Sequence, residues 1–423
     1  MNKLAKRIIA GLIALTFLFC LAGCNKGEDD ANTLKVGAIL VGDETEGYTL
    51  AHMNGMEEAK RKLADEGIKV EISYKKKIPE SEEVATNASD LVASGCKLVI
   101  TNSYGHQFNL GDVIDQNPDV NFVSMTGDLA AQSGKENYAN AFTKIYESRY
   151  VSGVVAGLKL QELINQGRLT PEAAPTAFDE WGNIKIGYVG AFPYAEVVSG
   201  YTAFYLGIKS IVPNVAMTVK YTNSWFSEER EAAVAEYLMG LGCVIIGQHA
   251  DSTGAPAAVE KAYQENNNLL CYSVGYNVSM LDAAPDVALT SSSNNWEVYY
   301  EYLFRAVAKG EKVATDWAEG YSQKAVGITE LGTACAAGTQ EYVSAIEGQI
   351  AAGTLQVFNT ATFTVQGQPV ADGELADVIP DDAYTPDTPA VQGGVFSESS
   401  LRSAPYFAIR IDGIAEVDSD YAE

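Results

Sequence analysis

The chain of 423 residues is 47% hydrophobic and 20% charged, so it is long and apolar enough to bury the cores of two domains. Acidic residues number 55 and basic residues 29, which gives a formal net charge of −26. We expect no nucleic-acid partner, because binding to a phosphate backbone requires a basic face.

The N-terminal stretch has the pattern of an exported lipoprotein. Basic residues precede an apolar run at 8–19 that is too short for a stable membrane span. The residues Leu-Ala-Gly-Cys that end at Cys24 resemble a bacterial lipobox, in which the cysteine is lipidated after cleavage. We therefore predict a lipoprotein signal peptide at 1–23, lipidation of Cys24, a flexible tether at 24–33, and a place at the cell membrane facing outside the cytoplasm. An ordinary secretory signal that contains a cysteine is the alternative.

From residue 34 onward, strand-like and helix-like segments alternate. Apolar runs at 34–40, 70–74, 97–102 and 121–127 predict strands, and the segments between them show helical spacing of apolar residues. This βα alternation predicts a parallel sheet with helices on both faces.

A second series of βα units follows a predicted helix in which Gly153, Ala156 and Gly157 offer a face for close packing. Its predicted strands begin with IKIGYVG and end with LLCYSVGY at 269–276. Two βα series joined by three crossovers predict two lobes with a cleft between them, a layout suited to ligand capture by hinge closure.

We assign residues 34–142 plus 290–322 to an N-terminal lobe and residues 143–289 plus 323–423 to a C-terminal lobe. Residues 366–405 of the second lobe are rich in Asp, Pro, Gly and Ser, which predicts an irregular insertion at the surface. The FAIRIDG run that follows predicts a return to a sheet edge.

Side chains at the predicted strand ends indicate a flat, polar ligand. Ligands of open parallel sheets bind outside the carboxyl ends of the strands, where this chain carries Phe192, Trp225 and Asp251. Aromatic rings can stack on a heterocycle, and Asp251 can accept from its N–H groups. Asn102 and Asn277 can each donate and accept. As alternatives, the aromatic residues could pack in a core and Asp251 could cap the following helix.

Catalytic and metal-binding patterns are not found in the sequence. It has no GxSxG elbow, no GxxxxGKS/T loop and no GxGxxG that opens a helix after a strand, so we predict that the protein is not an enzyme. The three histidines lack paired spacing, so we predict no metal site and no cofactor.

Several stretches together resemble a known family. They are AHMNGMEEA, SRYVSGVVAGL, KIGYVGAFPYAEVVSGYTAFYLGIKS, TNSWFSEEREAA, VIIGQHADS and VGYNVSM. In this order and spacing they resemble the BMP family of substrate-binding lipoproteins for ABC transporters, and its purine-binding branch most. The resemblance implies a two-lobed α/β fold of the periplasmic-binding-protein type I, in which each lobe has a mostly parallel sheet flanked by helices and the ligand lies in the cleft between the lobes.

The resemblance also implies which residues meet the ligand. Carried over by position, these are Tyr48, Phe192, Trp225, Asp251 and Asn277. From the residues themselves we add Asn102 as a candidate contact, together with Tyr104 and Trp296, which begin predicted helices and could instead pack in a core. Tyr48 stands where the branch often has a tryptophan, and the acidic residue that follows the branch's GYN sequence is missing here. We find no pair of an acidic residue and a lysine for ribose hydroxyls, which favours a free base over a nucleoside.

The implied function is that of a substrate-binding lipoprotein of an ABC importer, which captures a purine base or nucleoside and hands it to a membrane permease. We expect a monomer in which the ligand docks first on the C-terminal lobe, and closure then supplies Tyr48 and Asn102 from the N-terminal lobe. A ligand-sensing receptor lipoprotein without transport and a nucleoside-acting hydrolase are the alternatives.

Overall fold

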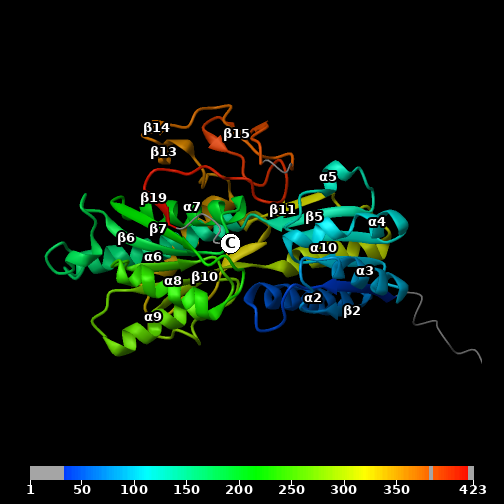
Figure 1. Ribbon diagram of the computed structural model, residues 1–423, viewed down its shortest axis with the longest axis horizontal. Coiled ribbons are helices and arrows are strands. Elements are labelled where there is room, and N and C mark those ends of the chain that lie inside the picture. The colour runs from blue at the N-terminus through cyan, green and yellow to red at the C-terminus, as the bar shows by residue number, and fades with distance from the viewer. Residues whose placement is uncertain (1–32, 381–383, 418–423) are drawn as a thin grey trace, which may run out of the picture.

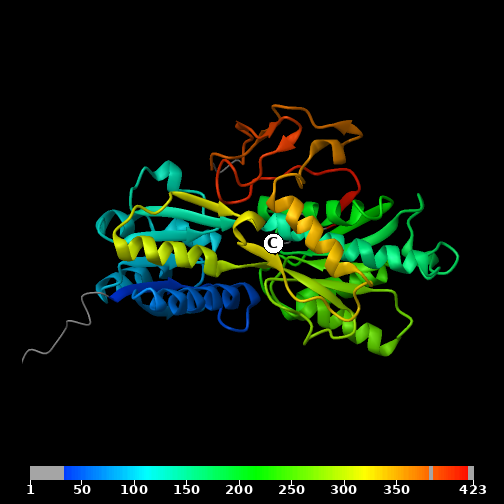
Figure 2. The same cartoon turned by 180° about the vertical axis from the view of Figure 1, so that it is seen from behind.

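The computed structural model describes residues 33–380 and 384–417. In this part of the chain the protein forms two α/β lobes that lie side by side, each built on one main sheet (Figure 1, Figure 2). The predicted signal peptide (1–23), the predicted lipidation site Cys24 and all of the predicted tether except Thr33 lie outside the described residues.

The strands of the N-terminal lobe are Thr33–Ile39 (β1), Lys69–Lys75 (β2), Leu98–Thr101 (β3), Asn121–Met125 (β4), Tyr138–Thr143 (β5) and Asp316–Glu319 (β11). They form a six-stranded parallel sheet in the order β11-β5-β4-β3-β1-β2. Every residue of β3 and β5 is buried, as expected for strands that are covered on both faces. Leu98 and Ile100 join one hydrophobic cluster and Val99 joins another, so successive side chains of β3 point to opposite faces.

The helices of this lobe are Gly47–Asp65 (α2), Glu83–Ala93 (α3), Gly111–Gln116 (α4), Ala130–Ser133 (α5) and Trp296–Lys309 (α10), together with the 3-10 helix Tyr104–Asn109 (η1). On one face of the sheet, α2 and α10 bring Met56 and Leu303 into the first cluster. On the other face, α3 and α4 bring Leu91 and Ile114 into the second. The sheet is therefore the middle of three layers, as the βα alternation predicts.

The strands of the C-terminal lobe are Ile184–Gly190 (β6), Val215–Tyr221 (β7), Ile245–Gln248 (β8), Tyr272–Tyr276 (β9), Ala288–Asn294 (β10), Val326–Ile328 (β12) and Ile414–Val417 (β19). Their order is β12-β10-β9-β8-β6-β7-β19, and among these described strands only β12 runs antiparallel to its neighbour. Because the chain reverses direction across the sheet after β7, the loops after β6 and β8 leave a crevice at the carboxyl ends of the strands.

The helices of this lobe are Ile145–Asn165 (α6), Ala195–Lys209 (α7), Glu228–Gly240 (α8), Gly254–Glu265 (α9) and Thr339–Ala351 (α11). Glycines bring α6 and α7 into close contact. A Cβ atom at Gly153 would lie 2.1 Å from the carbonyl oxygen of Phe204, and a Cβ atom at Gly207 would lie 2.1 Å from that of Tyr150. The glycine face predicted on α6 is therefore the contact surface for α7.

The sheet pairing differs from our assignment of residues 290–322 to the N-terminal lobe. Residues 290–294 belong to β10, which pairs with β9 and β12 in the sheet of the C-terminal lobe. The strand continues to Asn294, and the crossover comes only where α10 begins at Trp296. The boundary expected at 289/290 cuts through this strand, because the sequence gives no turn signal at the point where the chain changes lobe.

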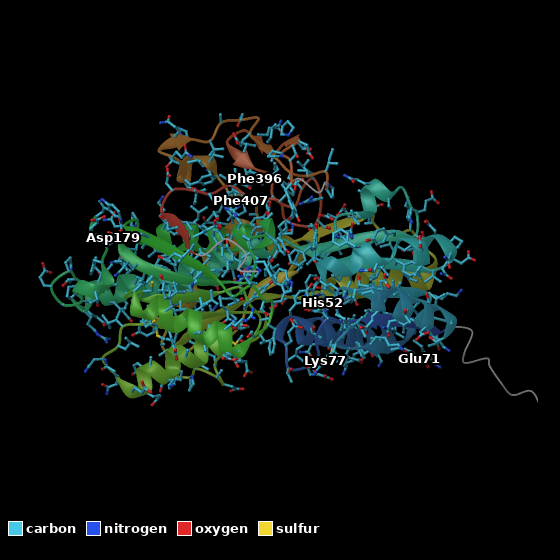
Figure 3. All side chains as sticks on the ribbon, viewed as in Figure 1. His52, Glu71, Lys77, Asp179, Phe396 and Phe407 are labelled. Carbon is cyan, nitrogen blue, oxygen red and sulfur yellow. The ribbon has the colours of Figure 1, made fainter. Side chains whose placement is uncertain are left out.

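The segment expected to be an irregular insertion (366–405) forms short hairpins. The strands in it and directly before it are Thr364–Val365 (β13), Gln368–Pro369 (β14), Leu375–Ala376 (β15), Thr388–Pro389 (β16), Val391–Gln392 (β17) and Val395–Phe396 (β18). We call the described residues between 364 and 413 the C-terminal segment. Figure 3 labels Phe396 and Phe407, whose ring centroids are 4.8 Å apart and which pack with Phe358 in the hydrophobic core of the C-terminal lobe.

The FAIRIDG run (407–413) is not a strand. Phe407 is fully buried in the core of the C-terminal lobe, and the Asp412 carboxylate accepts from the backbone N–H groups of Gln366 and Gly367 in the first hairpin. The return to the sheet edge comes directly afterwards in β19, which pairs in parallel with β7.

Candidate ligand-binding site

A cavity of about 840 Å³ lies between the two lobes. Loops after β1, β3 and β4 line it from the N-terminal lobe, loops after β6, β7 and β8 line it from the C-terminal lobe, and the C-terminal segment forms a further wall. The volume falls in the range of small-molecule sites. The predicted contact residues that line it are Tyr48, Asn102, Tyr104, Trp225 and Asp251.

The other three predicted contact residues lie behind this lining. Phe192 packs edge-on against Trp225 with ring centroids 5.0 Å apart. Asn277 donates from Nδ2 to Oδ1 of Asp251 at 2.8 Å. Trp296 is 1% exposed in the core of the N-terminal lobe, where its ring stacks on His52 at 4.3 Å. These three residues therefore support residues of the cavity wall and do not themselves line the cavity.

Aromatic rings face one another across the cavity. Trp225 and Tyr194 lie on the C-terminal lobe with centroids 6.0 Å apart and ring planes tilted by 40°. Tyr104 approaches Tyr194 from the N-terminal lobe at 6.4 Å. A flat heterocycle can lie against such rings, because their faces carry the negative part of the aromatic quadrupole and accept offset stacking.

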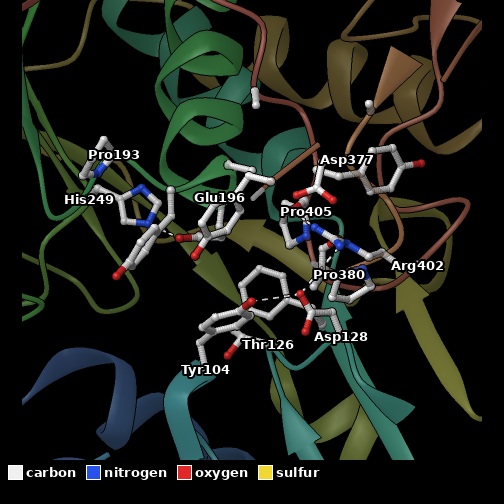
Figure 4. A pocket seen from close by; sticks show the side chains of 18 of the residues that line it. Tyr104, Thr126, Asp128, Pro193, Glu196, His249, Asp377, Pro380, Arg402 and Pro405 are labelled. Atoms are coloured by element: carbon white, nitrogen blue, oxygen red, sulfur yellow. Dashed lines mark hydrogen bonds and ion pairs between the residues drawn. The ribbon is translucent and has the colours of Figure 1, made fainter. Parts of the chain in front are cut away.

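A chain of polar side chains reaches the cavity wall at Glu196 (Figure 4). Oε2 of Glu196 lies 2.6 Å from Nε2 of His249, whose Nδ1 lies 3.2 Å from Nη2 of Arg149. Arg149 is 2% exposed, donates to the carbonyl oxygen of Gln248 and stacks on Tyr276 at 3.5 Å. Oε1 of Glu196 is buried and has no hydrogen-bond partner among the described residues. Glu196 therefore lines the cavity and carries a buried acceptor oxygen that is not satisfied by the described residues.

On the opposite wall, Tyr48 and Asn102 have different hydrogen-bonding capacity. The hydroxyl oxygen of Tyr48 is buried and has no partner within the described part of the chain. The Asn102 amide is already engaged, because Oδ1 accepts from the N–H of Val41 at 2.8 Å and Nδ2 donates to Oγ1 of Thr49 at 3.1 Å. Asn102 therefore shapes the first loop, and Tyr48 is the residue of this pair that can bond a ligand.

Two carboxyl groups from opposite lobes meet beside the cavity. Burial raises the pKa of Asp251 well above its usual value, and the negative charge of Glu46 adds to this shift. Burial raises the pKa of Glu46 to about 7. The N–H of Gly47 donates to the carbonyl oxygen of Asp251 at 3.2 Å, so the backbones of the two lobes touch at this point. Only one of the two carboxyl groups is readily ionised at a time, because two buried carboxylates in contact repel each other.

Sequence reasoning misses two parts of the cavity wall. Glu196 stands in the first turn of α7, where favourable interaction with the helix dipole is sufficient to explain it. The C-terminal segment lacks the periodicity that would predict its place in the fold. Among residues 33–380 and 384–417, no group of three His, Cys, Asp or Glu side chains is arranged to hold a metal ion.

Residues 43–360 match the Bmp family model, which describes PnrA-like ABC transporter substrate-binding proteins. A purine-binding protein of Brucella abortus is 31% identical over 300 residues, which cover 71% of this chain and 75% of that protein. A protein of Haloferax volcanii, provisionally named an ABC transporter glucose-binding protein, is 27% identical over 63% of this chain and 60% of its own length.

Solved structures show the same fold at lower sequence identity. ABC transporter solute-binding proteins from Aeropyrum pernix and Conexibacter woesei match with TM-scores of 0.60 and 0.57 at 13% and 17% identity. Each match covers 76% of this chain, with 92% and 98% of the respective structure. They confirm the predicted two-lobed periplasmic-binding-protein type I fold.

No helix in the described part of the chain is long and apolar enough to cross a membrane. With three quarters of its length matched, the chain belongs to the Bmp family of PnrA-like ABC transporter substrate-binding proteins.

Proposed function

We propose that this protein captures a purine base or nucleoside between its lobes and delivers it to an ABC permease. The observation that carries the proposal is the joint presence, in the lining of one cavity, of the Trp225 ring and of Glu196, whose Oε1 has no partner among the described residues. A purine can interact with both groups, because its flat π-face can stack on the Trp225 ring and its N–H groups can donate to the Glu196 carboxylate. The purine-binding relative from Brucella abortus supports the same ligand class.

The contributions expected from these residues suffice for tight binding. Stacking on an aromatic side chain contributes about 1–3 kcal/mol per base. A hydrogen bond to a charged acceptor such as Glu196 contributes about 1.5–3 kcal/mol. The hydroxyl of Tyr48 can donate to a ring nitrogen or accept from an amine. Asp251 adds a carboxyl group whose raised pKa favours the protonated form, which can donate, so the edge of the heterocycle meets polar groups from both lobes.

Binding is expected to be coupled to closure. The ligand docks on the C-terminal lobe against Trp225 and Glu196, and the N-terminal lobe then brings Tyr48 onto it. Contacts made in the closed form alone shift the population toward that form, which the permease recognises. Lipidation of Cys24 would hold the protein at the outer side of the cell membrane, where a permease can receive the ligand.

Calorimetric titration of the detergent-solubilised full-length protein tests the ligand class. Adenine, guanine, hypoxanthine, adenosine, guanosine and inosine are the probes, and D-glucose is added because of the Haloferax relative. Binding of a base without its nucleoside identifies a base-specific site, and binding of a nucleoside shows that the cavity also holds the sugar. Heat from glucose alone, or from no probe in a folded protein, overturns the purine assignment.

Two further measurements separate the alternatives. Recovery of the purine unchanged after prolonged incubation excludes a nucleoside-acting hydrolase. Loss of cellular uptake of that purine when the protein is deleted supports transport, whereas normal uptake supports a sensing receptor.

A further inference from the structure

The C-terminal segment lies beyond residue 360, where the match to the family model ends, yet it forms one wall of the cavity. Its lining residues include Leu375, Pro380, Tyr384 and Pro405. The segment lies over the junction of the two lobes on one side of the molecule (Figure 1, Figure 2). Figure 4 shows Asp377, Arg402 and Pro405 of the segment, with Arg402 next to Asp128 of the N-terminal lobe.

The segment is firmly attached to the C-terminal lobe. The ring of Phe407 stacks on Phe358 with centroids 4.2 Å apart and an interplanar angle of 14°. Directly after the segment, β19 extends the sheet beside β7, and Glu416 accepts from the hydroxyls of Tyr201 and Tyr221 at 2.6 Å and 2.5 Å. The segment therefore moves with this lobe if the cleft opens.

The same segment also contacts the N-terminal lobe. Nη1 of Arg402 lies 3.6 Å from Oδ2 of Asp128, and these side chains are only 10% and 3% exposed. The N–H of Ser403 donates to Oδ1 of Asp316 in β11 at 2.8 Å. Opening of the cleft would separate a nearly buried ion pair and break this hydrogen bond.

Both partners of the ion pair are fixed within their own parts of the molecule. Arg402 donates from Nη1 to the carbonyl oxygen of Val378 at 3.0 Å, which holds the segment together. The Asp128 carboxylate accepts from the Tyr104 hydroxyl and from Nε2 of Gln107, each at 3.0 Å. The ion pair therefore links two parts of the molecule in which each partner is already held in place.

We propose that the C-terminal segment is a third component of the ligand site, and that Arg402 is a positioning residue that holds this wall against Asp128 and so retains the ligand. The inference rests on the proposed function for the kind of ligand only. The wall is largely apolar and rich in proline and aromatic residues, so it fits the edge of a heterocycle and excludes bulky substituents. Arg402 thereby affects both the rate of ligand release and the largest ligand admitted.

The test compares R402M with R305M in full-length protein purified in detergent. Methionine keeps much of the aliphatic stem of Arg402 and removes the guanidinium. Arg305 is the matched control, because its ion pairs with Glu66 and Glu301 stay within the N-terminal lobe. Dissociation of each of the six purines that binds the wild type is followed by stopped-flow fluorescence, and hydrogen exchange of residues 384–406 is measured without ligand.

R402M is expected to release the purine about tenfold faster, because truncating one partner of a buried charge pair acts mainly on dissociation. R402M is also expected to bind N6-benzyladenine more readily than the wild type and to show faster hydrogen exchange over residues 384–406. R305M is expected to match the wild type in release rate, in binding of N6-benzyladenine and in hydrogen exchange. D128N, which removes the other charge, should reproduce these effects if R402M fails to fold.

Wild-type release and wild-type exchange in both R402M and D128N would overturn the role of Arg402. Failure of the purine assignment gives a different result, namely no binding to the wild type. The hydrogen-exchange measurement still tests in that case whether the Arg402–Asp128 ion pair holds the segment, since it needs no ligand.

Discussion

Nε2 of His249 lies 2.6 Å from Oε2 of Glu196, and Nδ1 of the same ring faces the guanidinium of Arg149. A guanidinium can only donate, so Nδ1 must accept and the proton of the neutral ring must sit on Nε2. Burial lowers the pKa of His249, which keeps the ring neutral. Arg149 thus fixes the tautomer that donates to Glu196, while Oε1 of this carboxylate has no partner among the described residues.

Replacement of Glu196 by glutamine is expected to weaken purine binding about ten- to a hundredfold, because the ligand N–H loses a charged acceptor. Calorimetric titration measures the change. E229Q is the control, since Glu229 occupies the same first-turn position in α8 but lies exposed, away from the cavity. Equal affinities of E196Q and E229Q would show that Glu196 serves only the start of its helix.

Replacement of Trp225 by alanine is expected to weaken the binding free energy for the purine by about 1–3 kcal/mol, the contribution of stacking on one ring. F192A should have a smaller effect, because Phe192 only supports the indole from behind. Thermal unfolding checks that both variants remain folded. W181A is the matched control, as Trp181 is 79% exposed and far from the cavity lining. A W225A variant that binds as W181A does would remove Trp225 from the site.

The topology of the sheet explains part of the cavity lining that the sequence predicts. Trp225 and Asp251 come after β7 and β8, and the topology of a parallel sheet brings such positions to one edge. Trp296 begins α10, and a helix start alone does not show whether a ring turns to the cavity or to the core. Its stacking on His52 depends on a residue distant in the chain, which no local pattern reveals.

The acceptor at Glu196 and the C-terminal wall could not be predicted for similar reasons. Arg149 and His249 are 100 residues apart, so their contact with each other arises only from the packing of α6 against the end of β8. The segment around Arg402 is held by a few aromatic contacts and by caps on its turns. Such contacts leave no periodic trace in the sequence, so the hairpins of this segment could not be predicted from it.

Asn277 tests the network that holds Asp251 in place. Its Oδ1 accepts from Nδ2 of Asn294 at 2.9 Å, its Nδ2 donates to Asp251, and its backbone φ of 62° is left-handed. Both N277A and N277G lose the side-chain bonds, which is expected to lower the free energy of unfolding by about 1–3 kcal/mol. N277A should lose about 1 kcal/mol more, because alanine is strained at this φ and glycine is not. Urea unfolding measures both, and equal losses would contradict the contribution of strain.

The carboxyl pair between the lobes predicts a pH dependence. Because the pKa of Glu46 rises from 4.5 to about 7 on folding, the folded protein binds more protons than the unfolded chain between these values. The free energy of unfolding therefore falls as the pH rises through this window, and the raised pKa of Asp251 acts in the same direction. Above about pH 7 the loss from Glu46 is complete.

E46Q is expected to remove this part of the pH dependence. Glutamine can still accept from the N–H of Thr49 at the start of α2, as Glu46 does at 3.2 Å, but it carries no charge beside Asp251. At pH 8 the variant should be more stable than the wild type by about 1–3 kcal/mol, and at pH 4.5 the two should agree. E58Q on the same helix is the control, because its ion pair with Arg61 is exposed and its removal should give no gain at pH 8. Parallel unfolding curves of E46Q and the wild type from pH 4.5 to 8 would show that Glu46 stays charged in the folded protein and that the two lobes tolerate both charges.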